Sequence, residues 1–135
     1  GLVGSEMCIR DRRNTGMGAS IAEGVKYIKE NESNVTGIII IPADMPLIDS
    51  DTIKKFFIAH SKSPESIIQA VDDNGSGHPV LFPLYYFKDL MMLKKETGGR
   101  KIIKKSKNTK ILKFAGNIAT LDLDTPEDWE NWRNK

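Results

Sequence analysis

Four consecutive isoleucines, residues 38–41, restrict the fold of this 135-residue sequence more than any other feature. Because β-branched residues favour strands and no polar residue alternates with them, the run predicts a strand buried on both faces. Such strands occupy the middle of a parallel sheet that is covered by helices on both sides. The sequence therefore predicts an α/β protein organised around this strand.

Asp44 stands directly after the predicted strand, between Pro42 and Pro46. Proline donates no hydrogen bond to a sheet and fixes the backbone, so the strand ends and Asp44 falls in a turn beyond its carboxyl end. Ligands bind at that edge of an open α/β sheet, and a carboxylate there is suited to hold a divalent cation. From spacing alone, a cap of the turn or of the next helix is an equally good interpretation.

The hydrophobic periodicity of the remaining chain predicts alternating helices and strands, which favours a parallel sheet with right-handed crossovers. His60, near a predicted helix end, is interpreted as a residue compatible with the helix dipole and not as a catalyst. The predicted helices cover about residues 20–30, 49–60, 83–93 and 102–103, with another beginning at Thr125, and the predicted strands cover 66–71, 110–114 and 118–124.

Composition and charge exclude several classes of protein. A net charge of +2 argues against a surface that binds nucleic acid, which needs a strongly basic face. The single cysteine, Cys8, can form no internal disulfide, which favours a reducing compartment. No run approaches the ~18 apolar residues of a membrane span. We therefore expect a cytoplasmic protein.

Residues 1–13 show neither helical nor strand periodicity. They have the character of a translated adapter, and we expect them to be non-native or a disordered tail. On this interpretation residues 14–135 form the domain.

Three glycine-bearing segments are candidates for ligand binding. Residues 16–20, Gly-Met-Gly-Ala-Ser, precede a helix and could present N–H groups to an anion, although helix capping is the more frequent role. The glycine before His78 and Pro79 lets a ligand approach the backbone closely. A structural role for His78, or packing against substrate, is a simpler interpretation than proton transfer. The segment from Lys94 to Lys113 has nine basic residues, Arg100 among them, and one acidic residue. A solvated surface is the simpler explanation of this charge asymmetry, and a rim that binds phosphate through Arg100 is the functional one.

Two acidic residues near the carboxyl terminus share one face of a predicted strand. Asp122 and Asp124 alternate with leucines there. Asp124 can support the following N-cap, Thr125, whereas Asp122 has no such local role. If Asp122 projects toward the same sheet edge as Asp44, the two carboxylates form a cation site.

Five motifs in this order resemble those of the MobA-like nucleotidyltransferases, and within them the molybdenum cofactor cytidylyltransferase (MocA-like) branch. The resemblance covers about residues 15–132. It implies a Rossmann-like three-layer α/β sandwich with a mostly parallel sheet, of the nucleotide-diphospho-sugar transferase type. The motifs are Gly16–Ile21, Pro42–Leu47, Gly77–Phe82, Gly98–Arg100 and Leu121–Asp128.

The resemblance implies transfer of a nucleoside monophosphate, CMP from CTP or the equivalent from GTP, onto a phosphorylated acceptor such as molybdopterin, with release of pyrophosphate. It implies Mg²⁺ as cofactor and a molybdoenzyme maturation partner. By position, Asp44 and Asp122 would be catalytic, and both would bind the metal together with Asp124. The implied substrate-binding residues are Gly16, Gly18 and Ser20 on the nucleotide side, and Gly77, His78, Pro79, Gly99 and Arg100 on the acceptor side.

The sequence departs from the family in one respect. Family members begin with a strand and a glycine-rich loop carrying arginine and lysine, whereas here no lysine precedes Lys26. We therefore expect a partial domain that lacks the triphosphate-binding loop, leaves part of its sheet exposed and is inactive by itself. A non-catalytic binding or regulatory module on the same fold, or a sugar-phosphate nucleotidyltransferase, remains an alternative.

Overall fold

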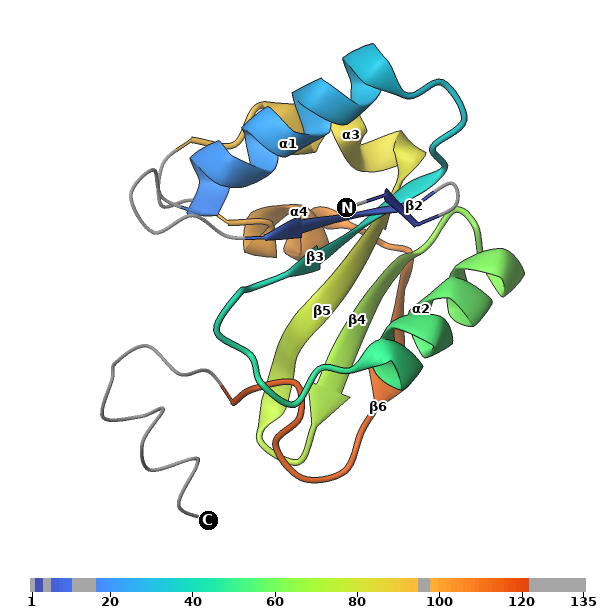
Figure 1. The fold of residues 1–135 in the computed structure, drawn as a ribbon. Coiled ribbons are helices and arrows are strands. Elements are labelled where there is room, and N and C mark those ends of the chain that lie inside the picture. The colour runs from blue at the N-terminus through green and yellow to red at the C-terminus, as the bar shows by residue number, and fades with distance from the viewer. Residues whose placement is uncertain (1, 4–5, 11–16, 95–97, 122–135) are drawn as a thin grey trace.

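The computed structural model describes residues 2–3, 6–10, 17–94 and 98–121, and its centre is a mixed sheet (Figure 1). The six described strands lie in the order β1-β2-β3-β5-β4-β6. Four of them, β2, β3, β4 and β6, run in one direction, while β5 is antiparallel to both of its neighbours. The strands are β1 (Leu2–Val3), β2 (Glu6–Arg10), β3 (Gly37–Ile41), β4 (Ile67–Asp72), β5 (Gly75–Pro83) and β6 (Thr109–Lys113).

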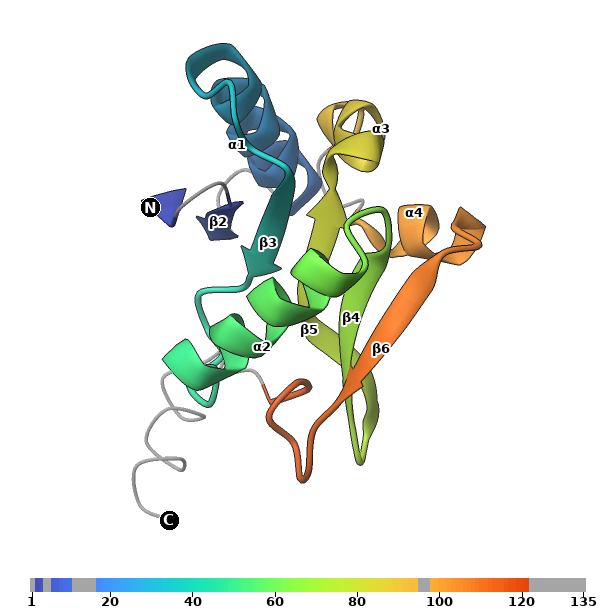
Figure 2. The same cartoon turned by 90° about the vertical axis from the view of Figure 1, so that its right-hand side faces the viewer.

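Helices cover both faces of the sheet, as the three-layer prediction requires. Figure 2 shows α2 against one face, in front of β4 and β5, while α1 and α3 lie together on the other side. None of the helices in the described ranges has the length and hydropathy needed to cross a membrane. The helices are α1 (Met17–Asn31), α2 (Ser50–Lys62), the 3₁₀ turn η1 (Leu84–Tyr86), α3 (Phe87–Met91) and α4 (Arg100–Lys105).

Strand β3 forms the middle of the core, which confirms the prediction from its isoleucines. Ile38 and Ile40 belong to the cluster on the α1 and α3 side, and Ile39 packs with Phe56 of α2 on the other. Ile38 and Ile39 are both fully buried. Since successive side chains of a strand point to opposite faces, helices on both sides are what bury an unbroken apolar run.

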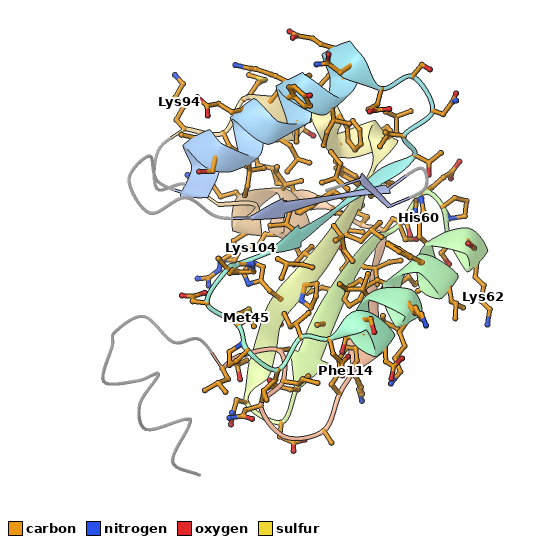
Figure 3. All side chains as sticks on the ribbon, viewed as in Figure 1. Met45, His60, Lys62, Lys94, Lys104 and Phe114 are labelled. Atoms are coloured by element: carbon orange, nitrogen blue, oxygen red, sulfur yellow. The ribbon has the colours of Figure 1, made fainter. Side chains whose placement is uncertain are left out.

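Helix α2 begins where its sequence predicts and ends at Lys62, two residues beyond the predicted end. Its N-cap is Asp49, whose Oδ1 accepts hydrogen bonds from the Thr52 N–H (2.9 Å) and hydroxyl (3.0 Å). These bonds, the backbone one foremost, lower the pKa of Asp49 from its ordinary value. Near the other end His60 is 4% exposed, and its Nε2 lies 3.0 Å from Thr36 Oγ1. This position, away from the carboxyl end of β3, agrees with a structural role for His60 (Figure 3).

Part of residues 1–13 is structured, which differs from the expectation of a disordered tail. The backbone of β2 pairs in parallel with β3 over Glu6–Arg10, and β1 pairs antiparallel with β2. An extended segment of almost any composition can pair in this way, because the unpaired backbone groups of an edge strand accept it. The edge of β3 is therefore covered. That these residues are foreign to the domain stays a prediction.

The described part of residues 118–124 is also not the strand that its alternation predicted. Residues 116–120 form a turn, in which the N–H groups of Thr120 and Leu121 both bond to the Asn117 carbonyl. Asp122 and Asp124 lie outside the described residues, as does the helix expected from Thr125. The prediction failed because side-chain and backbone partners on β4 and β5, described below, fold this segment back on itself.

Candidate functional site

A cleft of about 840 Å³ opens beside the carboxyl end of β3. Its walls come from the turn after β3, the first half of β5, the start of α4 and the 116–120 turn. Figure 3 shows two of the lining side chains, Met45 and Lys104, on the same side of the sheet. Most of the residues that line the cleft are polar or glycine: Asp44, Gln69, Ser76, Gly77, His78, Gly98, Gly99, Arg100, Lys101, Lys104 and Thr120.

Asp44 lies where its flanking prolines predicted it. β3 ends at Ile41, and both Pro42 and Asp44 line the cleft. The adjacent Met45 is 8% exposed and anchors the turn in the protein interior. A half-buried carboxylate is thereby held at the edge of the sheet where ligands bind in α/β folds.

An irregularity in the pairing of β4 with β5 directs Gly77 and His78 into the cleft. Between the pairs Gln69↔Val80 and Val71↔Ser76, β4 advances two residues and β5 advances four. Pro79 has no N–H for the ladder, and the His78 N–H instead donates to the Ala119 carbonyl at 2.9 Å. The His78–Pro79 peptide bond is cis. Bulges of this kind often redirect side chains beside functional sites.

The buried carboxylate of Asp72 holds the 116–120 turn against this bulge. Its Oδ2 accepts hydrogen bonds from the Ala119 N–H (2.9 Å) and the Thr120 hydroxyl (2.8 Å), and its Oδ1 accepts one from the Asn74 N–H (2.8 Å). Burial raises the pKa of Asp72, but these hydrogen bonds together outweigh burial and leave it below its ordinary value of 3.8. A charged Asp72 therefore fixes one wall of the cleft.

Two glycines allow the walls of the cleft to approach each other. A Cβ on Gly77 would overlap the carbonyl group of Ala119, and a Cβ on Gly99 would come within 2.8 Å of the Phe82 ring. Gly99 directly precedes α4, whose Ile102 is buried in the core. Both positions require glycine because a neighbour occupies the space of the side chain.

Five of the predicted site residues line the cleft: Asp44, Gly77, His78, Gly99 and Arg100. Pro79 does not line the cleft and is fully buried. Gly18 and Ser20 lie buried in the first turn of α1; neither lines the cleft, although Ile21 of the same helix does. Gly16, Asp122 and Asp124 lie outside the described residues.

Sequence reasoning missed five polar residues of the cleft, namely Gln69, Ser76, Lys101, Lys104 and Thr120. Lys104 could have been found from its spacing, because it stands one helical turn after Arg100 and shares its face. Gln69 and Thr120 carried no comparable signal.

The described residues that line the cleft supply one carboxylate ligand suited to a divalent cation. Asp44 is the sole acidic residue among the described residues that line the cleft, and no group of three His, Cys, Asp or Glu residues suited to a metal occurs within the described ranges. Carboxylate oxygen is the ligand that Mg²⁺ and Mn²⁺ prefer.

The fold is that of an NTP transferase domain. Residues 4–110 match the family model of the MobA-like NTP transferase domain, so the chain belongs to that family. A search of the curated proteins found no match.

Solved structures with the same fold include two of Rv0371c from Mycobacterium tuberculosis H37Rv. One is a complex with manganese, at 24% identity and a TM-score of 0.72, which covers 93% of this chain and 63% of Rv0371c. The other has 23% identity and the same TM-score, and covers 61% of Rv0371c. CMP:2-keto-3-deoxy-manno-octonic acid synthetase, solved with CTP, has 9% identity and a TM-score of 0.63, with 96% of this chain and 79% of the synthetase covered. This chain thus spans less than two thirds of the Rv0371c structures.

Proposed function

We propose that the cleft is part of the active site of a cytidylyltransferase, which moves CMP from CTP onto a phosphorylated acceptor and releases pyrophosphate. The observation that carries this proposal is the meeting of Asp44, from the end of β3, with the cationic start of α4 in one cleft of an NTP transferase domain. The CTP complex of the structurally similar synthetase supports CTP as the donor over GTP.

Each wall of the cleft has its own part in this reaction. Asp44, with Asp122 and Asp124, would hold Mg²⁺, which when bound neutralises charge on the reacting phosphates. Asp122 follows the cleft-lining Thr120 by two residues, and two residues of extended chain span at most about 7 Å. Arg100 and Gly99 would receive the acceptor phosphate, while Gly77 and His78, supported by Pro79, would pack against the substrate. Gly16 would border the nucleotide, whereas Gly18 and Ser20 are buried and do not line the cleft.

The acceptor proposed is the molybdenum cofactor or its molybdopterin precursor, and the partner a molybdoenzyme that receives the product. The support is the order of the motifs that resemble the MocA-like branch, from Pro42–Leu47 to Leu121–Asp128. The single cysteine supports a cytoplasmic location.

Metal binding tests the role of Asp44. Titration of the ¹⁵N-labelled chain with Mn²⁺ is expected to broaden the amide signals of residues 43–45 before others, because the ion is paramagnetic and sits at that turn. Asp44→Asn removes the charged ligand and is expected to weaken this binding at least tenfold. Asp89→Asn, an exposed acid on α3, is the matched control. Equal broadening in wild type and Asp44→Asn would favour a non-catalytic module.

Turnover tests whether this chain suffices for catalysis. No segment of the sequence matches the loop with arginine and lysine that grips triphosphate, so we expect no measurable transfer of label from radiolabelled CTP to molybdopterin by the 135-residue chain. Appreciable turnover would contradict the proposal that the triphosphate-binding part is missing.

A further inference from the structure

Helix α4 lies between two clefts and presents basic residues to each. Arg100 and Lys104 line the cleft that contains Asp44. A second cleft on the other side is lined by Lys101 and Lys105, together with Tyr85 and Tyr86. Residues four apart lie on the same helix face, so the two pairs project from α4 in different directions, although Lys101 also reaches the first cleft.

The pair Arg100 and Lys104 lines the cleft without an ion-pair partner among the described residues. Both side chains are exposed, and no hydrogen bond or ion pair within the described ranges engages either of them. Like charges four residues apart in a helix repel each other. An anion placed between the two side chains would remove that repulsion and would receive donors from both.

The chemistry of the two side chains selects the kind of anion. The planar guanidinium of Arg100 can donate two parallel hydrogen bonds to one phosphate, whereas the ammonium of Lys104 acts as a compact point charge on the same group. Behind them α4 is fixed by the buried Ile102, and Gly99 packs its backbone against Phe82. Asp44 is the one acidic residue among the described residues that line the same cleft.

We propose that Lys104 is a phosphate-binding residue of the cleft and acts together with Arg100 as a dibasic pair on α4. The inference rests on the proposed function and adds to it a residue that the family motifs do not include. Figure 3 shows Lys104 on the same side of the sheet as Met45, the residue that follows Asp44. The bound phosphate comes either from the acceptor or from the nucleotide, and both have the charge that this pair recognises.

The test uses the 135-residue chain and inorganic phosphate as probe, followed by ¹H–¹⁵N correlation spectra. In wild type, phosphate is expected to shift the amides of residues 98–104. Lys104→Met is expected to weaken this binding about tenfold or more, since one charge-assisted contact is lost. Lys104→Arg keeps the charge and should restore most of it. Lys105→Met, the next residue on the same helix, faces the second cleft and should leave it unchanged.

The sources of the phosphate are distinguished by adding CTP. If CTP displaces inorganic phosphate, as read from the amide signals of residues 98–104, Arg100 and Lys104 bind the nucleotide phosphate. If CTP and inorganic phosphate bind at the same time, the two residues bind the acceptor phosphate. Equal effects of Lys104→Met and Lys105→Met, or no phosphate-induced shift at residues 98–104, would overturn the inference. Neither the phosphate titration nor the Mn²⁺ titration depends on turnover. Loss of phosphate binding with intact Mn²⁺ binding would overturn the role of Lys104 alone. Loss of Mn²⁺ binding with intact phosphate binding would contradict the proposed role of Asp44.

Discussion

Replacing Gly77 by valine is expected to lower the free energy of unfolding by about 3 kcal/mol, the upper end of the usual cost of overpacking. A Cβ at this position overlaps the backbone carbonyl of Ala119, and backbone cannot turn aside as a flexible side chain can. The Ala119 turn must therefore move away from β5, which breaks the hydrogen bond from the His78 N–H and opens the wall of the cleft.

Urea denaturation followed by far-ultraviolet circular dichroism measures this loss. The matched control is Ser76→Val, which places the same side chain on the preceding, exposed residue of β5 and should change stability by less than about 1 kcal/mol. Loss of hydrogen-exchange protection at His78 should accompany Gly77→Val alone. If both variants unfold at the same urea concentration as wild type, the packing of Ala119 on Gly77 is not as described.

Replacing Asp72 by alanine is expected to cost about 2–3 kcal/mol, because three donors that now bond to its carboxylate lose their partner. The neighbouring Asp73→Ala is the control. Asp73 is exposed and accepts one hydrogen bond from the Gly116 N–H at 2.8 Å, so its loss should cost about 1 kcal/mol or less. Comparable losses for the two variants would contradict the anchoring role of Asp72.

The contribution of Asp72 is also expected to depend on pH in one direction. Its pKa in the folded protein lies below the ordinary value of 3.8, so the unfolded chain binds the proton more readily. The stability it provides is therefore fully present above that ordinary value and is lost as the pH falls through the lowered pKa. The difference in stability between wild type and Asp72→Ala should be constant near neutral pH and shrink only in strong acid.

Local signals in the sequence were sufficient for the strand and turn that carry Asp44. The isoleucine run and the two prolines act through backbone sterics and burial, which need no knowledge of distant residues. The start of α2 and the strand predicted at 110–114, observed at Thr109–Lys113, were predictable for the same reason. The motif at Gly77 pointed to a close approach, although not to Ala119 as the group that approaches.

Features decided by contacts between distant segments were not predictable. Apolar and polar residues alternate over Ile118–Leu121 as in a strand. Asp72, more than forty residues earlier, instead holds this segment in a turn by accepting hydrogen bonds from Ala119 and Thr120. Strand β5 was hidden because its first half contains glycines and Pro79, which depress strand propensity while shaping the bulge. Residues 6–10 had no periodicity to predict a strand, since pairing with β3 depends on backbone and not on side chains.

The reversed direction of β5 has a consequence for the order in which the chain assembles. Strands β4 and β5 are joined by Asp73 and Asn74 alone, so their hairpin closes a very short loop. The pairing of β3 with β5, from Gly37↔Pro83 to Ile40↔Val80, closes a much longer loop. Strands that are close in sequence pair quickly, whereas pairing of distant strands has a larger entropic cost of loop closure. We therefore expect the hairpin that contains His78 to form first, and Asp44 to be placed when β3 pairs with it.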